Sequence, residues 1–459
     1  QISKVSATES PSCPSEIPLA VDFVRKRTLD IRWMSRPCGE ECPRCRDILA
    51  TIPAEEENRR ASVPNQIAGN RSCSPRFFYK KQESRYKEDA MRNSRYYLGL
   101  MLKLAPLLAS MGITSAMIDS LIYEKCFAKG RYYRSWSLKK KNGKLRKISE
   151  PCEPLKIIQQ AIVGYLYKFP LHPALKAYIK GKNGVMEAAK THQFEVIGKD
   201  GRKIVRPPRW LLKIDLKDFF PSIRKDVVGR VITLNFLYDE EMRKEIFSLG
   251  EAIGEKPHKL FQQLVKVLTW LTAGRGCLLQ GAPTSPSLAN LVWTESLRID
   301  ILERHLVESK KEFNLAVYAD DISISLLGKR YPKKLIKEIA EIINGSECFR
   351  INPEKTRLNK LKHGAHSVTG ISITRDEGDH EPKIGISQKY LNAFRGDIHR
   401  ANKIMWDGRC PTMDEDGVSI ANIRGRLNWV RSVYGEKGLP SSIRKLVPLF
   451  EALAKAHRQ

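Results

Sequence analysis

Hydrophobic residues recur along this chain at two spacings, and each spacing predicts a different kind of element. Apolar residues three or four positions apart predict helices over residues 96–111, 155–165 and 420–434. Short apolar runs bounded by turn residues predict strands over 136–148, 210–215 and 316–325. Because both periods occur in one chain, we expect a fold of the α+β class.

Turn residues refine this picture. Lys141-Asn142-Gly143 divides residues 136–148, and Asn-Gly between strands is a strong signal for a β-hairpin. Lys199-Asp200-Gly201 predicts a second hairpin within 195–210, to which the sequence assigns no function. A proline-containing loop at 283–286 is expected to precede a helix over 288–302.

The hairpin predicted over 316–325 carries acidic residues at its turn, in Tyr318-Ala319-Asp320-Asp321. A further carboxylate, Asp215, ends the apolar run that begins at Trp210. Two strands side by side would bring Asp215 and Asp320 together. Magnesium prefers oxygen ligands and a few protein carboxylates, and paired ions about 4 Å apart clamp both oxygens of phosphoryl transfer. A solvated Asp-Asp turn is the alternative.

Charge points to a polyanionic partner. The chain of 459 residues has 80 Lys and Arg against 51 Asp and Glu, a formal net charge of +29. Such a charge favours sequence-independent, salt-sensitive binding to nucleic acid, and a membrane surface would suit it too. No run of 18 or more apolar residues occurs and no secretion signal opens the chain, so we expect no membrane partner.

The order of the motifs resembles that of reverse transcriptases. Asp215 with Phe219-Phe220, then the segment 280–286, then the Tyr-Ala-Asp-Asp tetrad are similar to motifs A, B and C of that family. Residues 351–356 resemble motif D, and 143–148 with 154–159 resemble the fingers of bacterial members. The resemblance covers the chain from about residue 90 to its end.

A right-hand polymerase fold is what this resemblance implies. Fingers would occupy residues 86–210, the palm 211–385 and a helical, RNA-binding thumb 386–459. Residues 1–85, rich in Ser, Pro, Glu and Arg, are expected to form a partly ordered N-terminal extension.

The resemblance also implies roles for individual residues. Asp215, Asp320 and Asp321 would hold two Mg²⁺ ions, with Asp321 shaping the field more than ligating. Lys355 would protonate the pyrophosphate leaving group, the alternative being an ordinary surface lysine. Nucleotide binding would fall to residues of the fingers hairpin, motif A and motif B, namely Lys144, Arg146, Phe220, Gln280 and Gly281. Among these, Phe220 would limit the room beside the sugar 2′ carbon.

Two short elements resemble those of retron reverse transcriptases in particular. Val368-Thr369-Gly370 matches a retron element after motif D, and Ala188-Ala189-Lys190-Thr191-His192 matches one before motif A, except that Ala188 replaces Asn. Because of that departure, related group II intron and phage-defence reverse transcriptases remain alternatives. His192 is expected to be a structural histidine or to contact the RNA backbone, and this is favoured over a catalytic role. RNA binding is also expected on one face of a thumb helix, formed by Arg424, Asn428 and Arg431, with a merely solvated face as the alternative.

A retron-like enzyme implies an RNA-directed DNA polymerase that copies a cognate structured non-coding RNA, starting from an RNA 2′-hydroxyl. Its product would be single-stranded DNA linked to RNA (msDNA), held as a ribonucleoprotein in the bacterial cytoplasm. The resemblance implies antiviral defence with an effector or toxin protein as partner. Alternatives are a protein-primed or untemplated defence or intron-type reverse transcriptase, and a ribonucleoprotein scaffold that sequesters an effector.

Cysteines near the N-terminus have spacing found in zinc sites. Cys38, Cys42 and Cys45 form a C-x3-C-x2-C cluster, for which Cys73 or Cys13 could supply the fourth zinc ligand. The alternative is a set of reduced cysteines with no metal, as expected in a cytoplasm.

Overall fold

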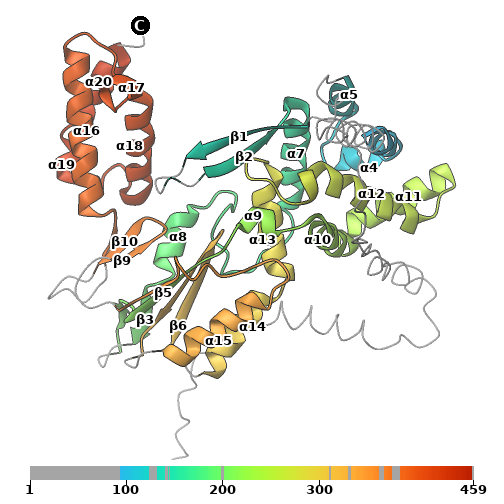
Figure 1. Cartoon of the computed structure of the whole chain (residues 1–459), viewed down its shortest axis with the longest axis horizontal. Helices are drawn as coiled ribbons and strands as arrows, with labels where there is room; N and C mark the ends of the chain where they lie inside the picture. The colour runs from blue at the N-terminus through green and yellow to red at the C-terminus, as the bar shows by residue number, and fades with distance from the viewer. Residues whose placement is uncertain are drawn as a thin grey trace, which may run out of the picture.

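The structure is a computed structural model that describes residues 94–123, 132–139, 143, 145–197, 201–309, 312–328, 332–360, 366–374 and 383–456. Lys144 and the four cysteines of the predicted zinc site lie outside the described residues. Figure 1 shows three groups of elements, with a central sheet and its helices, a second group that includes the β1–β2 hairpin, and a separate C-terminal group of helices.

A four-stranded antiparallel sheet is the centre of the fold, with strand order β6-β7-β5-β8. Its strands are β5 (Trp210–Asp215), β6 (Phe313–Tyr318), β7 (Asp321–Leu326) and β8 (Arg357–Lys360). The β6–β7 pair is the hairpin predicted over 316–325, with Tyr318 opposite Asp321. Because β5 pairs with both β7 and β8, the strand that carries Asp215 lies inside the sheet.

Alternation along the strands places the two faces of the sheet in different cores, because successive side chains of a strand point to opposite faces. Leu212 and Ile214 belong to the large core, together with residues of the helices around it. Leu211 and Ala316 instead join a small cluster with Ala188 of α8 (Gly184–Lys190). Both faces of the sheet are therefore packed against buried residues.

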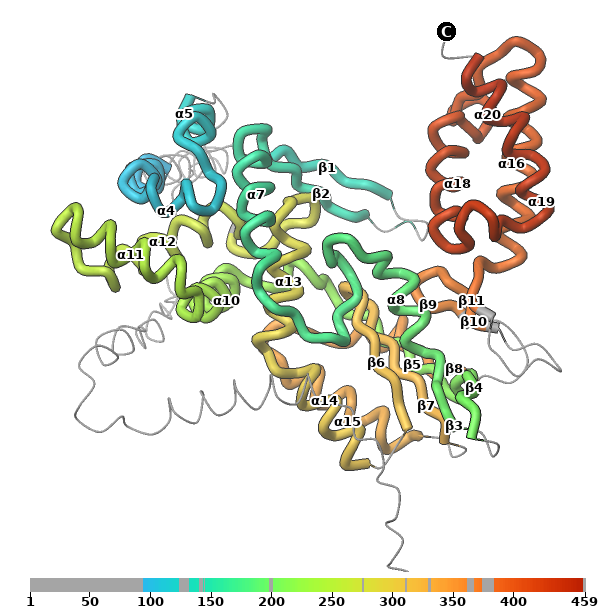
Figure 2. The backbone as a smooth tube through the Cα atoms, turned by 180° about the vertical axis from the view of Figure 1, so that it is seen from behind, coloured from blue at the N-terminus to red at the C-terminus, as the bar shows by residue number. Residues whose placement is uncertain are grey.

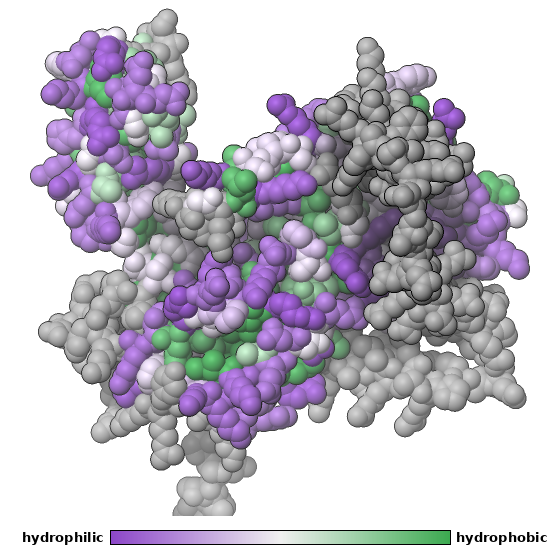
Figure 3. All heavy atoms as spheres, in the orientation of Figure 1, coloured by the Kyte–Doolittle hydropathy of each residue, from purple (hydrophilic) through white to green (hydrophobic). Residues whose placement is uncertain are grey.

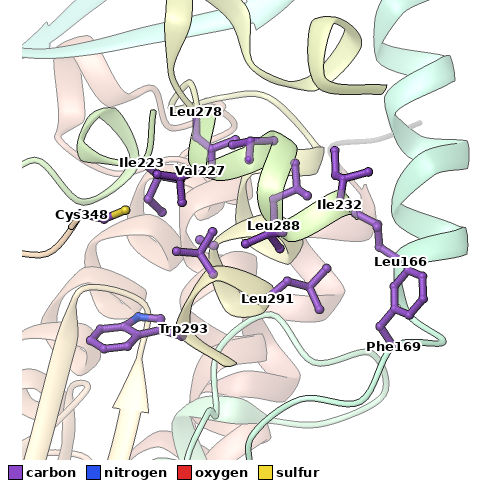
Figure 4. Close-up of a cluster of buried hydrophobic side chains, with 14 of the residues drawn as sticks. Leu166, Phe169, Ile223, Val227, Ile232, Leu278, Leu288, Leu291, Trp293 and Cys348 are labelled. Atoms are coloured by element: carbon purple, nitrogen blue, oxygen red, sulfur yellow. The ribbon is translucent and has the colours of Figure 1, made fainter. Parts of the chain in front are cut away.

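Helices packed on the large core include α7 (Glu153–Leu166), α10 (Lys225–Leu237), α13 (Thr284–Glu295), α14 (Arg298–Glu308) and α15 (Lys333–Asn344). Figure 4 shows Leu166 and Phe169 at one side of this core and Trp293 and Cys348 at the other, with Leu288 and Leu291 between them. On α7, Leu155, Ile158 and Ile162 are buried, which confirms the predicted stripe. Further elements of this part are α4 (Ala105–Ser110), α5 (Ser115–Tyr123), α9 (Phe219–Ser222), α11 (Glu240–Ile253), α12 (Pro257–Thr272) and the short 3-10 turn Gly274–Gly276.

The other two predicted hairpins are also present. β1 (Tyr133–Lys139) pairs antiparallel with β2 (Leu145–Pro151), and β3 (Phe194–Ile197) pairs with β4 (Lys203–Arg206). A three-stranded sheet of β9 (His366–Val368), β10 (Ile371–Thr374) and β11 (Lys383–Gly385) leads to the C-terminal helices.

One prediction of a helix is wrong in its extent. The helix expected over 288–302 is two helices, because Leu297 between α13 and α14 has a left-handed backbone with φ +54°. A residue in that conformation ends an α-helix, so the chain changes direction there.

The C-terminal helices form a unit with its own core. Its elements are α16 (Gln388–Trp406), α17 (Met413–Asp416), α18 (Ile420–Tyr434), α19 (Ser441–Arg444) and α20 (Val447–Ala456). Ile423, Leu427 and Val430 of α18 are buried in this core, as their spacing predicted. Figure 3 shows a mostly hydrophilic surface over the visible face of this unit.

Candidate active site

The acidic residues singled out in the sequence meet at one end of the central sheet. Asp215 and Asp321 lie directly opposite each other in the β5–β7 pairing. Directly opposed residues of antiparallel strands point to the same face. Asp320 lies in the turn just before β7, where its carbonyl oxygen accepts a hydrogen bond from Leu216 N at 3.1 Å. The register of two strand pairs thus gathers all three residues.

These carboxylates repel one another in a partly dehydrated place. Burial raises the pKa of Asp320, and the Asp215 carboxylate raises it further, while Lys355 and Arg146 oppose both effects. Burial also raises the pKa of Asp321, and the charge of Asp320 adds to that. A site that destabilises its own negative charges gains most from a cation.

The donor set fits Mg²⁺, since the carboxylates are hard oxygen ligands, and Mg²⁺ typically takes only one or two protein carboxylates beside water and substrate phosphates. Within the residues that the structure describes, no group of three or more His, Cys, Asp or Glu side chains is arranged to hold a metal ion by itself. If the metal binds here, Asp215, Asp320 and Asp321 are the residues that would hold it.

Lys355 reaches this cluster. Its ammonium group donates hydrogen bonds to both carboxylate oxygens of Asp215, at 2.8 and 2.9 Å. Asn352 supports the same residue, because its side-chain amide donates to Asp215 Oδ2 at 3.1 Å and its backbone N–H to the Asp215 carbonyl at 2.7 Å. Lys355 therefore lies at the carboxylates and not on an unrelated surface. Asn352 was missed as a site residue, although it lies three residues before Lys355 in the segment that resembles motif D.

Backbone strain is concentrated around these residues. Asp218, which precedes α9, has φ +44°, and Ala319, in the turn beside Asp320, has φ +56°. Residues with side chains adopt such angles at a cost, and strained residues cluster at functional sites. These backbone angles set the direction of the chain just before Asp320 and just before α9.

Apart from Lys144, which lies outside the described residues, the residues predicted to bind nucleotide lie on β2, on α9 and in the loop before α13. Arg146 is exposed on β2, and its positive charge is felt at Asp320. Phe220 is half-buried on α9, with its ring centroid 5.1 Å from that of Phe219. Phe219 continues this row of rings inward, stacking on Phe349 at 5.7 Å.

Gln280 and Gly281 lie against the β1–β2 hairpin. Ser149 of β2 donates its backbone N–H to the Gln280 carbonyl at 2.7 Å. Gly281 has φ +111°, and a Cβ on it would lie 2.9 Å from the Ser149 carbonyl oxygen. Only glycine fits this position, so the loop at 280–281 and β2 are held as one surface.

His192 is a structural histidine, which confirms one of its two expected roles, and the predicted contact with RNA is wrong. The residue is fully buried beneath β7, where Nδ1 lies 2.8 Å from Ser325 Oγ and Nε2 lies 2.7 Å from Ser323 Oγ. Burial lowers its pKa to about 3, so the ring is neutral. Ser323 Oγ donates to the Ala316 carbonyl at 3.2 Å, which leaves it free to accept from Nε2–H. His192 thus fastens the segment after α8 to the catalytic hairpin.

The thumb residues predicted to bind RNA divide into two groups. Arg431 forms ion pairs with Glu436 and, at 2.8 Å, with Glu451 of α20, so its charge is already neutralised within the unit. Arg424 is half-buried and donates to the Ala454 carbonyl at 3.4 Å. Both arginines therefore face α20, and the pairing of Arg431 argues against an RNA contact there, whereas the RNA contact of Arg424 stays a prediction. Asn428 is exposed, and its RNA contact stays a prediction.

Among the described helices, none combines the length and the apolar character that crossing a membrane requires.

Comparison with known proteins agrees with the site geometry. The reverse transcriptase (RNA-dependent DNA polymerase) family matches residues 138–373, just over half of the chain. The retron Mx162 reverse transcriptase of Myxococcus xanthus is 26% identical over 341 residues, 72% of this chain and 63% of that protein. The retron Mx65 enzyme of the same species is 25% identical over 68% of this chain and 66% of its own length. The chain thus spans slightly less than two thirds of each of these relatives.

The retron Ec86 reverse transcriptase of Escherichia coli is 26% identical over 78% of this chain and 92% of that protein. Among solved structures, apo telomerase from Candida tropicalis aligns over 74% of this chain and 64% of its own, with 12% identity and a TM-score of 0.38. The predicted right-hand polymerase fold and the retron-type resemblance are confirmed. Because the family match covers the strands, the carboxylates and the glutamine loop described above, the chain belongs to the reverse transcriptase family.

Proposed function

We propose that this protein is an RNA-directed DNA polymerase whose active centre is formed by Asp215, Asp320 and Asp321. The observation that carries the proposal is the strand pairing that sets Asp215 opposite Asp321, with Asp320 in the adjoining turn. Reverse transcriptases use divalent metal ions, and the carboxylate cluster matches the oxygen ligands that Mg²⁺ prefers.

The reaction joins a primer hydroxyl oxygen to the α-phosphorus of a deoxynucleoside triphosphate and breaks the bond to pyrophosphate. Bound Mg²⁺ would neutralise charge on the attacking and leaving oxygens. Lys355 would give a proton to the departing pyrophosphate, a role that its 2.8 Å bond to Asp215 supports, and Arg146 of β2 would supply further positive charge. Phe220 would contact the sugar beside its 2′ carbon, which favours deoxynucleotides.

We further propose that the template is a cognate structured non-coding RNA, that an RNA 2′-hydroxyl primes synthesis, and that the product is single-stranded DNA joined to RNA. The similarity to retron reverse transcriptases and the complete Val368-Thr369-Gly370 element support this proposal. The net charge of +29 suits a large RNA partner. On the same resemblance, we propose a role in defence against phage with an effector or toxin protein, in the bacterial cytoplasm.

Sequencing of nucleic acid that co-purifies with wild type and with Asp320→Asn, before and after RNase treatment, tests this proposal. One structured RNA in both samples, joined to one defined DNA in wild type only, is the expected result. DNA of mixed sequence, or DNA still attached to protein after RNase, would favour a protein-primed or untemplated enzyme. RNA without DNA in both samples would favour a scaffold that sequesters an effector.

A further inference from the structure

Five non-glycine residues have a positive φ in the part of the chain that the structure describes, and Tyr178 is among them. Asp218, Ala319 and Thr369 belong to motifs already considered, and Leu297 joins two helices. Tyr178, with φ +59°, belongs to no such motif. A left-handed backbone costs an L residue about 1–2 kcal/mol, so a tyrosine there needs a reason.

The residues just before Tyr178 are hydrogen-bonded to strand β6 and to helix α13. Lys176 N donates to the Val317 carbonyl at 2.8 Å, and Val317 N donates to the Ala174 carbonyl at 2.8 Å. Asn290 of α13 donates its side-chain amide to the Ala177 carbonyl at 2.8 Å. Figure 2 shows this connection between α7 and α8 running beside β6. The strained residue is therefore held firmly in place.

The Tyr178 ring lies next to the catalytic turn and is open to solvent. Its centroid is 6.4 Å from that of Tyr318, the first residue of the Tyr-Ala-Asp-Asp tetrad, and the residue is 41% exposed. Burial of the phenol and the negative charge of Asp320 both raise its pKa, which places its hydroxyl within the field of the catalytic carboxylates. An exposed aromatic side chain on a rigid loop beside a polymerase centre offers a surface on which a nucleotide can pack.

The sheet order indicates which reactant meets this surface. Strands run β6-β7-β5-β8, so Lys355, which bonds to Asp215 of β5 and precedes β8, lies on the side of the carboxylates away from β6, and Phe220 follows β5 in the chain. Those two residues are the ones proposed to handle the sugar and pyrophosphate of the incoming nucleotide. Tyr318 at the end of β6 and Tyr178 beside it lie on the other side. The reaction needs the priming strand opposite the incoming nucleotide, which is the side of the two tyrosines.

We propose that Tyr178 is a primer-positioning residue, whose ring packs with Tyr318 against the terminal nucleotide of the priming strand. This inference rests on the proposed polymerase function. It explains why a tyrosine occupies a backbone conformation that glycine adopts freely.

Tyr178→Gly is an informative variant because it removes the ring and the backbone strain together. The full-length protein would be assayed for extension of a DNA primer on an RNA template, with KM measured separately for primer–template and for dNTP. We expect an about tenfold rise in the KM for primer–template, an unchanged KM for dNTP and no fall in Tm. Tyr178→Phe keeps the ring, so its KM for primer–template should stay within about twofold of the wild-type value.

Leu297→Gly is the matched control, since Leu297 has a similar φ of +54° and is 37% exposed but lies at the junction of α13 and α14. It should leave both KM values unchanged. An unchanged primer–template KM in Tyr178→Gly, or a rise in the dNTP KM alone, would overturn the inference. The Kd of labelled primer–template, measured by fluorescence anisotropy, separates the two proposals. If wild type fails to extend the primer but Tyr178→Gly still weakens this binding, the polymerase function fails and the contact stands.

Discussion

The catalytic end of the sheet and the C-terminal helical unit use charge in opposite ways. At the sheet, Asp215, Asp320 and Asp321 are gathered together, and their mutual repulsion and burial raise the pKa of the latter two. In the helical unit, positive side chains find partners of their own, as Arg431 does with Glu451.

Arg426 shows the same behaviour. It pairs with Asp397 and lies over the rings of Tyr390 and Phe394, at 5.0 and 4.6 Å from their centroids. Opposite charges paired within the fold stabilise it, whereas like charges held close together are stabilised when a ligand of opposite charge binds. A count of basic residues along a helix therefore does not identify an RNA-binding face, whereas three carboxylates with a single lysine bonded to them, among the described residues, are what a cation site would need.

The largest expected effect comes from the conflicting charges themselves. Asp215→Asn removes one negative charge and leaves Lys355 without its partner, so we expect kcat for primer extension to fall by at least about 10³-fold, because metal assistance contributes several kcal/mol. Single-turnover extension at saturating dNTP measures this loss. A loss below about tenfold would mean that Asp215 is not part of the reacting centre.

Lys355 should matter next, as the one cation bonded to the cluster in the described residues. Lys355→Gln keeps a hydrogen-bond donor but cannot transfer a proton, so we expect kcat to fall about 10²-fold. Lys360→Gln is the control. Lys360 lies on β8 with its ammonium group 5.5 Å from the centroid of the Trp210 ring, so its substitution should leave kcat unchanged. An equal fall in kcat in both variants would show that Lys355 does not transfer the proton.

His192 tests how rigidly the catalytic hairpin must be held. His192→Ala would leave the hydroxyls of Ser323 and Ser325 without the ring and open a cavity beneath β7. We expect the free energy of unfolding to fall by about 3 kcal/mol, measured by denaturant titration. A change below about 0.5 kcal/mol would show that the buried pair of hydrogen bonds does not stabilise the fold.

The same histidine predicts a pH dependence. Its pKa is about 3 in the folded protein against an ordinary value of 6.5, so below pH 6.5 the unfolded chain takes up a proton that the folded protein does not. The stability contributed by neutral His192 is present above pH 6.5 and is lost as the pH falls from there toward 3. Unfolding titrations at pH 7 and 5.5 should show a larger loss for wild type than for His192→Asn. Equal losses would place the titrating group elsewhere.

The smallest effect is expected in the helical unit. Arg431→Ala should lower stability by less than about 1 kcal/mol, because its glutamate partners are largely exposed. It should also leave unchanged the slope of RNA affinity against salt concentration, since an arginine already paired with glutamates contacts no phosphate. A fall of about one unit in that slope would restore Arg431 as an RNA contact.

Local patterns predicted much of this fold. The hairpin around Asn142-Gly143, the buried stripe of α18 and the carboxylates at the strand ends follow from turn chemistry and from spacing along the chain. The hydrogen bonds of His192 were not predicted because its partners Ser323 and Ser325 lie 131 and 133 residues away, and nothing near it in the chain signals burial. The same holds for Arg431, whose partner Glu451 belongs to another helix. Tyr178 was not predicted at all, because its significance lies in a backbone angle and in the nearby Tyr318 ring.

The most direct test of the account is extension of a DNA primer on an RNA template by wild type and Asp320→Asn, over a series of Mg²⁺ concentrations. The account predicts template-directed DNA synthesis by wild type that depends on Mg²⁺ and is absent in Asp320→Asn, with RNA binding equal in the two proteins. Synthesis that persists in Asp320→Asn, or wild type that binds RNA but adds no nucleotide, would contradict it.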